Sequence, residues 1–129
     1  MPSPQVSVII PALDAEATLG CALDSALSGD VEVLVIDDGS EDGTSELVRD
    51  RRDRRIRLLN TPRTRSGVGV ARNVGLDAAR GEWVALLDAD DRWDAGRLTS
   101  LLEIAGAERA DVVADDLQIT RDGAVAESL

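Results

Sequence analysis

Two almost unbroken apolar runs constrain the fold of this chain more than any other feature. Residues 6–11 (VSVIIP) and residues 31–36 (VEVLVI) are rich in β-branched side chains. Such runs are typical of strands that are buried on both faces, as in a parallel sheet covered by helices. Between them, residues 16–28 repeat apolar side chains at helical spacing. The start of the chain therefore predicts a strand, a helix and a second buried strand.

The same alternation continues toward the end of the chain. It predicts further helices over residues 44–52, 67–79 and 97–105, and further strands over residues 56–59, 83–87 and 111–114. Strands that alternate with helices predict an α/β fold of Rossmann-like type, with a mostly parallel sheet and helices on both faces. The length of 129 residues suits one domain, residues 1–129. Because the pattern stops at Leu129 without a closing element, we expect a truncated domain.

Several boundaries carry more specific expectations. Ser40 or Asp42 is expected to cap the second helix, and Arg80 and Gly81 to close the third one. Residues 117–120 and the residues from 124 onward predict a hairpin around an Arg-Asp-Gly turn. Cys21 lies between two leucines of a helical pattern, which favours a buried position.

The composition excludes several kinds of chemistry. The sequence has no histidine and no lysine, so all fourteen basic residues are arginines. This excludes a Ser-His-Asp triad, a histidine-bound zinc, a Schiff base and a Walker A lysine. A net charge of −11 argues against nucleic acid as a partner. A single cysteine, the lack of a recognisable signal peptide and the lack of an apolar run of about 20 residues favour a cytoplasmic protein without a transmembrane segment.

The chemistry is expected where the predicted strands end. In open α/β sheets, ligands bind outside the carboxyl ends of the strands. Acidic residues follow three of these ends, at Asp14, at Asp37 and Asp38, and in the sequence Asp88-Ala89-Asp90-Asp91. Crowded carboxylates raise one another's pKa unless a cation neutralises them. Ligation by oxygen alone points to Mg²⁺ or Mn²⁺, and such a metal is suited to binding a nucleoside diphosphate.

Each motif also has a purely structural interpretation. Asp-Asp-Gly-Ser at residues 37–40 is a favourable turn and helix start, and Asp-Ala-Asp-Asp at residues 88–91 is compatible with a solvated loop. Their occurrence at successive strand ends of one sheet favours a site. Gly67-Val68-Gly69 lacks the third glycine of a dinucleotide-binding loop and indicates a tight helix entry instead. Arg72 is placed to pair with the acidic residues or to contact phosphate.

At these residues the sequence resembles the family 2 glycosyltransferases, which have the GT-A fold. The resemblance rests on residues 6–16 (VSVIIPALDAE), 32–44 (EVLVIDDGSEDGT), 69–91 (GVARNVGLDAARGEWVALLDADD) and 110–116 (ADVVADD). It implies a donor site for a nucleotide-diphosphate sugar, with a UDP-sugar favoured. It further implies transfer of the sugar, with inversion, to an acceptor hydroxyl of a glycan or lipid-linked acceptor in polysaccharide, glycolipid or cell-wall assembly. Peripheral association with the inner face of a membrane is compatible with that role.

The resemblance also implies roles for individual residues. Pro11, Leu13, Asp14 and Glu16 would line the nucleotide pocket, and Asp38 would accept a hydrogen bond from the base. Asp88 would contact the ribose or sugar and Asp90 would hold the metal, with Asp88 as a second metal ligand. Arg72 completes the expected donor site. Leu13 and Asp14 replace the Tyr-Asn pair that is frequent in the family, which removes a stacking ring and adds a negative charge. The general base is expected in a C-terminal half, so no catalytic residue is assigned.

Other functions remain open at this point. A sugar-phosphate nucleotidyltransferase has a similar sheet, but residues 11–18 (PALDAEAT) lack its glycine-rich loop. A phosphorelay receiver domain has a similar length and acidic pocket, but it requires a lysine. A non-catalytic fragment or subunit that binds a nucleotide sugar and a metal is the main alternative to an enzyme.

Overall fold

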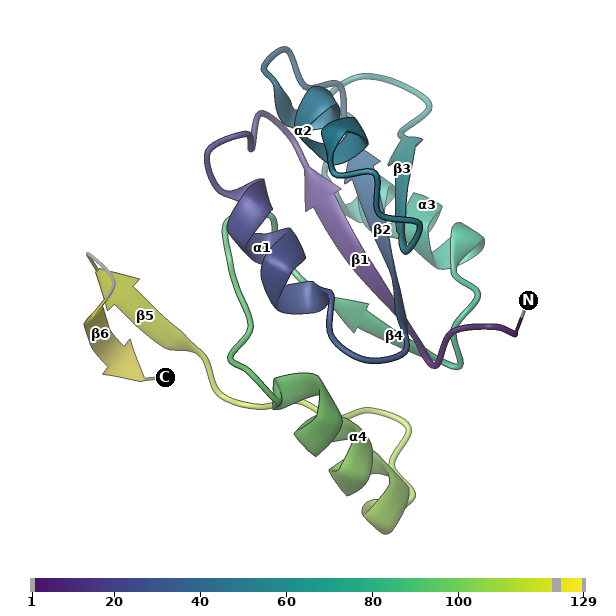
Figure 1. Cartoon of the computed structure of the whole chain (residues 1–129), viewed down its shortest axis with the longest axis vertical. Coiled ribbons are helices and arrows are strands. Elements are labelled where there is room, and N and C mark those ends of the chain that lie inside the picture. Colours follow the sequence, from purple (N-terminus) through teal and green to yellow (C-terminus); the bar gives the residue numbers. More distant parts are fainter. Residues whose placement is uncertain (1, 122–123, 129) are drawn as a thin grey trace. The chain divides into compact units, whose positions relative to one another are not determined.

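The computed structural model describes residues 2–121 and 124–128 (Figure 1). Its elements follow in the order β1 (Val6–Ala12), α1 (Leu19–Ala26), β2 (Val31–Asp37), α2 (Thr44–Asp50), β3 (Ile56–Asn60), α3 (Val68–Ala78), β4 (Trp83–Leu86), α4 (Arg97–Glu108), β5 (Gln118–Arg121) and β6 (Ala124–Ser128). The chain divides into two compact units between Trp93 and Asp94. Among the described helices, none has the length and apolar character needed to span a membrane.

The first unit contains a four-stranded sheet in the order β3-β2-β1-β4. All three neighbouring pairs are parallel. The two predicted buried runs form the centre of this sheet, where β1 and β2 pair from Val6 and Val31 through Ala12 and Asp37. Nearly every residue of these two strands is buried, whereas β3 and β4 at the edges are only partly covered. The predicted parallel α/β sheet is confirmed.

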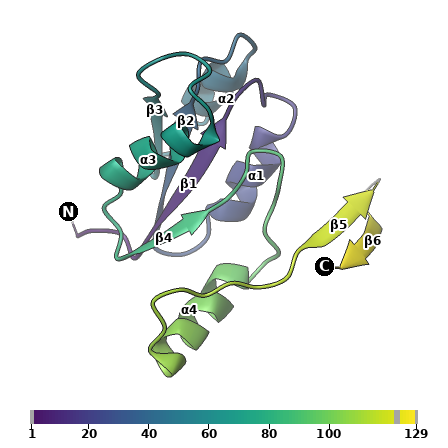
Figure 2. The same ribbon diagram turned by 180° about the vertical axis from the view of Figure 1, so that it is seen from behind.

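Helices cover both faces of the sheet, as the two opposite views show (Figures 1 and 2). Helices α1 and α2 lie on one face, and α3 lies on the other. On the α3 side, Ala71 packs in a buried cluster with Ile9, Leu34 and Ile36. A Cβ atom on Gly75 would lie 2.6 Å from Cγ2 of Ile9, so the absence of a side chain there lets α3 approach β1 closely.

Polar residues form a closed network at the amino ends of the strands. The hydroxyl of Ser7 donates to Glu32 Oε1 at 2.6 Å, and Nη1 of Arg57 donates to Glu32 Oε2 at 3.1 Å and to the carbonyl of Ala78 at 2.9 Å. The Arg80 amide donates to Glu32 Oε1 at 2.8 Å, and the Gly81 amide donates to Ser7 Oγ at 2.8 Å. We call Ser7, Glu32, Arg57, Arg80 and Gly81 the amino-end network.

Burial raises the pKa of Glu32, but the hydrogen bonds from Ser7, the Arg80 amide and Arg57 outweigh it. The pKa of this carboxyl group therefore lies below the ordinary glutamate value of 4.5. The network also corrects the expected end of the third helix. Helix α3 ends at Ala78 with Ala79 as its C-cap residue, because the Arg80 and Gly81 amides are bonded to Ser7 and Glu32.

Three expectations about α1 and α2 were also wrong. Helix α1 begins at Leu19 and not at residue 16, because the Glu16 amide bonds to the Asp42 carboxylate. The residue that precedes α2 is Gly43, although Asp42 Oδ1 does accept a hydrogen bond from the Thr44 amide at 3.0 Å. Cys21 is exposed, because the buried stripe of α1 runs through Leu19, Ala22, Leu23 and Ala26.

The second unit contains α4 and the β5–β6 hairpin. Helix α4 continues to Glu108, beyond the expected end at residue 105. The strand expected over residues 111–114 does not form, and Val112 within it is 85% exposed. In the described part of the chain, residues 111–114 belong to no strand pair, and Asp115 after them is bound to Arg97 at 2.7 Å. The antiparallel hairpin is confirmed, and residues 122 and 123 of its turn lie outside the described residues.

Candidate functional site

The strand order places the candidate site. The chain runs outward from β1 to β2 and β3, and then returns to the other side of β1 to form β4. A crevice forms outside the carboxyl ends of the strands at such a reversal. A cleft of about 420 Å³ lies at this reversal, between the segments that follow β1 and β4 and the start of α3; it is lined by Pro11, Leu13, Asp14, Ala15, Thr18, Val68, Arg72, Asp88, Ala89 and Asp90. It brings together all of the predicted site residues except Glu16 and Asp38.

The segment after β4 presents carboxylates at this cleft. Leu87 and Ala89 are buried, whereas Asp88, Asp90 and Asp91 are exposed. A backbone hydrogen bond of 3.1 Å from the Asp91 amide to the Asp88 carbonyl turns the chain back on itself. As a result, carboxylate oxygens of Asp88, Asp90 and Asp91 lie within 4.8 Å of one another. We call these three residues the acidic cluster.

The acidic cluster fits a divalent cation. Burial raises the pKa of Asp91, and the negative charges of Asp90 and Asp88 raise it further. A cation among these oxygens would relieve that repulsion, and an all-oxygen ligand set suits Mg²⁺ or Mn²⁺. The family resemblance implied Asp90 and Asp88 as metal ligands, and that role stays a prediction. The structure adds Asp91 to the same group of carboxylates, because the turn at Asp88 brings the fourth residue of the motif beside the first.

Arg72 is the cationic side chain among the residues that line the cleft. It lies on α3 one turn after Val68, so both side chains face the same opening. Its Nη2 atom donates to Asp88 Oδ1 at 3.1 Å. Its Nε atom is buried and has no hydrogen-bond partner among the described residues. Arg72 therefore holds a positive charge at the cleft, beside the acidic cluster.

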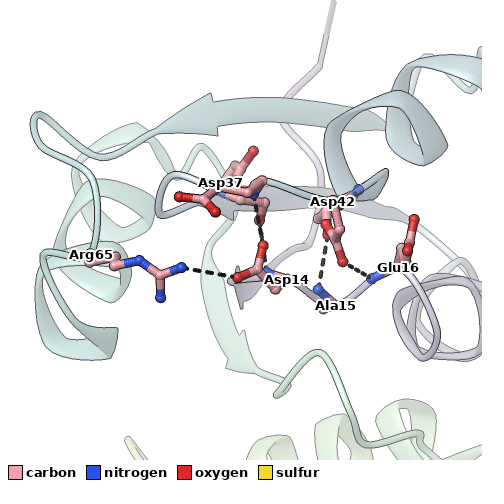
Figure 3. Close-up of polar contacts among 9 residues, drawn as sticks. Asp14, Ala15, Glu16, Asp37, Asp42 and Arg65 are labelled. Carbon is pink, nitrogen blue, oxygen red and sulfur yellow. Dashed lines mark hydrogen bonds and ion pairs between the residues drawn. The ribbon is translucent and has the colours of Figure 1, made fainter.

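Two predicted pocket residues after β1, Asp14 and Glu16, have their carboxylates engaged in loop contacts; Figure 3 shows the contact of Asp14 with Arg65. Asp14 Oδ1 accepts a hydrogen bond of 2.7 Å from the Glu41 amide, and Glu16 Oε2 accepts one of 2.8 Å from the Gly43 amide. Asp14 still lines the cleft, and Leu13 beside it is 38% exposed. Direct contact of Asp14 and Glu16 with a nucleotide stays a prediction. Asp14 has φ 49°, in the left-handed region that Asn and Asp tolerate better than most residues.

Asp38 is buried at the end of β2 and holds the loop before α3. Its carboxylate accepts hydrogen bonds from the Thr61 hydroxyl at 2.7 Å and from the Ser66 and Gly67 amides at 2.7 and 2.8 Å. Burial raises the pKa of Asp38, but these bonds outweigh it and leave the pKa below its ordinary value. A hydrogen bond from a nucleobase to Asp38 stays a prediction, and it would be added to these three.

The neighbouring Asp37 and Gly39 support the turn interpretation of the same motif. Asp37 accepts hydrogen bonds from the Ser40 amide at 2.8 Å and from the Ser45 hydroxyl. Gly39 has φ 88°, and a Cβ atom there would lie 2.6 Å from Cβ of Thr64. The Asp-Asp-Gly-Ser sequence is therefore a structural turn at Asp37 and Gly39, and it also places Asp38 under the loop that leads to α3.

Comparison with known proteins places the chain in a family. The model of glycosyl transferase family 2 matches residues 7–126. The succinoglycan biosynthesis protein ExoO of Rhizobium meliloti (strain 1021) is 41% identical over 119 residues, which are 90% of this chain and 34% of that protein. The Escherichia coli protein WfgD, named as a UDP-Glc:alpha-D-GlcNAc-diphosphoundecaprenol beta-1,3-glucosyltransferase, is 40% identical over 96 residues, which are 72% of this chain and 38% of that protein.

Solved structures agree with this placement. The structure of residues 1–349 of Staphylococcus aureus TarS in complex with UDP-GlcNAc matches with a TM-score of 0.76 and 29% identity, covering 83% of this chain and 32% of that one. The corresponding complex with UDP also has a TM-score of 0.76, with 29% identity, and it covers 83% of this chain and 33% of that one. The chain spans about a third of the length of the curated relatives it matches. It has the fold of the GT-A glycosyltransferases, and it belongs to glycosyl transferase family 2.

Proposed function

We propose that residues 1–129 form the donor-binding portion of a glycosyltransferase, which binds a nucleotide-diphosphate sugar in the cleft between β1 and β4. The observation that carries this proposal is the acidic cluster. Three carboxylates with oxygens within 4.8 Å of one another lie at the strand reversal, beside Arg72. Membership of glycosyl transferase family 2 supports the interpretation of this geometry as a site for a nucleotide-diphosphate sugar.

Asp88, Asp90 and Asp91 would hold Mg²⁺ or Mn²⁺, with Asp90 as the principal ligand. Bound there, the cation would neutralise the diphosphate and stabilise the charge that develops on it as the sugar leaves. The residues of this chain provide the surroundings for that chemistry. Arg72 is placed to contact a phosphate oxygen through its guanidinium group, because it lines the cleft and its side chain is 36% exposed. Pro11 and Leu13 form the apolar side of the cleft.

The nucleotide is proposed to be a UDP-sugar. The structural matches include TarS complexes with UDP-GlcNAc and UDP, and WfgD is named for transfer from UDP-Glc. Asp38 is the proposed partner of the base. Its pKa is held low by its hydrogen bonds, so it remains an acceptor at neutral pH and suits a nucleobase N–H donor.

The remaining features of the reaction are proposed for the whole protein. The sugar would pass to an acceptor hydroxyl by a single in-line displacement, which inverts the anomeric centre. We assign no general base to residues 1–129 and expect that group in a separate acceptor-binding portion. By analogy with the named relatives, the acceptor would be a growing polysaccharide or a lipid-linked glycan. A cytoplasmic location with peripheral membrane association fits such an acceptor.

Thermal unfolding with UDP and Mn²⁺ tests the donor site. A ligand present at about a hundred times its Kd stabilises a folded protein by about 2.7 kcal/mol, which raises the melting temperature of a small domain by several degrees. We expect this rise with UDP and Mn²⁺ together, and we expect Asp90→Ala to abolish it. Asp77→Ala, which removes an exposed carboxylate of α3 outside the cleft, is the matched control and should retain the rise.

Two experimental outcomes would contradict the proposed donor site or the proposed enzymatic activity. The absence of a metal-dependent rise with any nucleoside diphosphate would contradict a donor site. A rise without any release of UDP from a panel of UDP-sugars, with or without added glycan acceptors, would favour the alternative function, which is non-catalytic binding of a nucleotide sugar and a metal.

A further inference from the structure

The loop that lines the cleft after β1 has its backbone donors occupied before any ligand binds. Three successive amides of this loop each donate to a side chain of the segment between β2 and α2 (Figure 3). These bonds run from Asp14 to Ser40 Oγ at 2.9 Å, from Ala15 to Thr44 Oγ1 at 2.9 Å and from Glu16 to Asp42 Oδ2 at 3.2 Å. A diphosphate in the cleft therefore cannot rely on these amides, although Asp14 and Ala15 line it.

The same two segments are also joined in the opposite direction. The carboxylates of Asp14 and Glu16 accept hydrogen bonds from the Glu41 and Gly43 amides, at 2.7 and 2.8 Å. Side chains of each segment thus satisfy the backbone of the other. We call this set of reciprocal bonds the loop clasp; it comprises Asp14, Ala15, Glu16, Ser40, Glu41, Asp42, Gly43 and Thr44.

Asp14 is the residue where a third segment joins the loop clasp. Its second carboxylate oxygen, Oδ2, is 3.3 Å from Nη2 of Arg65, which lies in the loop between β3 and α3. The Arg65 amide in turn donates to the Asp38 carbonyl at 2.7 Å. Asp14 therefore contacts both neighbouring loops while it lines the cleft, and its φ of 49° is a backbone conformation that few residues adopt at low cost.

We infer that Asp14 is a positioning residue, which fixes the wall of the cleft for the nucleotide sugar by binding the Glu41 amide. This inference rests on the proposed function. A charge-assisted hydrogen bond of 2.7 Å to a backbone amide is strong. The contact with Arg65 contributes less, because both side chains are well exposed, at 38% and 55%. The carboxylate of Asp14 thus acts mainly through its hydrogen bond to the Glu41 amide.

Substitutions at one position separate the carboxylate from the backbone conformation. Asp14→Gly keeps the left-handed conformation without cost and removes the acceptor. Asp14→Asn also tolerates this conformation and keeps an oxygen for the Glu41 amide, so it is the expected rescue. Arg65→Gln removes only the ion pair. Ser7→Ala, at the opposite end of the sheet, is the control for a general loss of stability.

Amide hydrogen exchange reports on the loop clasp itself. In Asp14→Gly, we expect the Glu41 amide to exchange about tenfold faster than in the unmodified protein, which corresponds to the loss of one charge-assisted bond. The Gly43 amide, which binds Glu16, should keep its rate within about threefold of that in the unmodified protein. An unchanged rate at Glu41 would overturn the inference, because the bond would then not hold the loop.

Binding of UDP in the presence of Mn²⁺ reports on the cleft. Asp14→Gly should weaken it about tenfold, whereas Asp14→Asn, Arg65→Gln and Ser7→Ala should each stay within about threefold. If Asp14→Gly frees the Glu41 amide but binds UDP normally, the loop clasp is only structural and the inference is wrong. If the unmodified protein does not bind UDP, the proposed function fails, and the inference fails with it.

Discussion

Both ends of the parallel sheet carry acidic side chains, but these side chains differ in burial and in hydrogen bonding. At the amino end, Glu32 is buried and binds Ser7, Arg57 and the Arg80 amide. At the carboxyl end, Asp90 and Asp91 are exposed and have no hydrogen-bond partner for their carboxylates among the described residues. Partial desolvation raises the pKa of both Glu32 and Asp91, yet the final direction differs. Hydrogen bonds bring the pKa of Glu32 below its ordinary value, whereas the charges of Asp90 and Asp88 raise that of Asp91 further.

This difference separates acids that the fold supplies with hydrogen-bond donors from acids that it leaves without them. A buried carboxylate with all its partners present stabilises the protein only as part of its network, since removing one member leaves the others without a partner. Carboxylates that crowd together without donors are destabilising to one another and are relieved by a cation. The acid that the fold requires is therefore Glu32, and the acids that the fold leaves available are Asp90 and Asp91 of the acidic cluster.

The substitution Glu32→Ala should have the largest effect on stability. It removes one acceptor from the Ser7 hydroxyl, the Arg57 guanidinium and the Arg80 amide. Arg57 keeps the Ala78 carbonyl and the Arg80 amide keeps Ser7 Oγ as partners, and we expect a loss of about 3 kcal/mol in the free energy of unfolding. Glu32→Gln keeps one acceptor oxygen and should lose about half as much. Urea unfolding measures both values. A loss below about 1 kcal/mol for Glu32→Ala would mean that the amino end is not held by this network.

Substitutions at two glycines test whether the two ends of the sheet are packed equally tightly. A Cβ atom on Gly81 would lie 2.6 Å from the Ser7 backbone nitrogen, whereas one on Gly69, in the first turn of α3, would meet nothing within 4 Å. We expect Gly81→Ala to cost about 2 kcal/mol through overpacking. Gly69→Ala should instead stabilise the protein by about 0.5 kcal/mol, because it lowers the entropy of the unfolded chain. Equal effects in chemical unfolding would contradict the difference in packing.

The pH dependence of stability should reflect Glu32. Because folding lowers the pKa of Glu32 below 4.5, its contribution is complete above that pH and is lost as the pH falls through the folded-state value. Asp37 and Asp38 act in the same direction. Between neutral pH and about pH 3, we expect Glu32→Gln to lose less stability than the unmodified protein. Parallel pH profiles in urea unfolding would exclude this contribution.

The smallest expected effect on stability is that of Asp90→Ala. No described residue donates a hydrogen bond to this carboxylate, and its removal lessens repulsion within the acidic cluster. The free energy of unfolding should therefore change by less than about 0.5 kcal/mol. Chemical unfolding in a metal chelator measures this value. A loss of 2 kcal/mol or more would place Asp90 with Glu32 among the structural acids and remove the contrast between the two ends.

The sequence predicted best those features that depend on a local pattern of residues. The unbroken apolar runs predicted β1 and β2, because a strand buried on both faces cannot tolerate many polar residues. The helical spacing of apolar residues predicted the helices, and the rule for open sheets predicted the end of the sheet where the cleft lies. Pro11, Leu13, Asp14, Arg72, Asp88 and Asp90, which were chosen on that basis and on the family resemblance, line the same cleft.

The hydrogen-bond partners of the site residues could not be predicted from local patterns. Asp14, Glu16 and Asp38 bind amides that are 27 to 29 residues away along the chain, and no local pattern encodes such a distance. The strand expected over residues 111–114 was wrong for a related reason. Its apolar residues have a suitable propensity, but a strand also requires a neighbour, and tertiary structure determines whether one is present.

The most direct test of the account is paramagnetic broadening of amide signals by Mn²⁺ in the presence of UDP. The two ends of β1 are about 20 Å apart, so a single bound ion should affect them differently. We predict that the signals of Leu13, Arg72 and Asp90 disappear first, whereas those of Ser7 and Arg80 remain, and that Asp90→Ala abolishes the effect. Broadening that is centred elsewhere, or that is the same in Asp90→Ala, would contradict a metal-dependent donor site at the carboxyl end of the sheet.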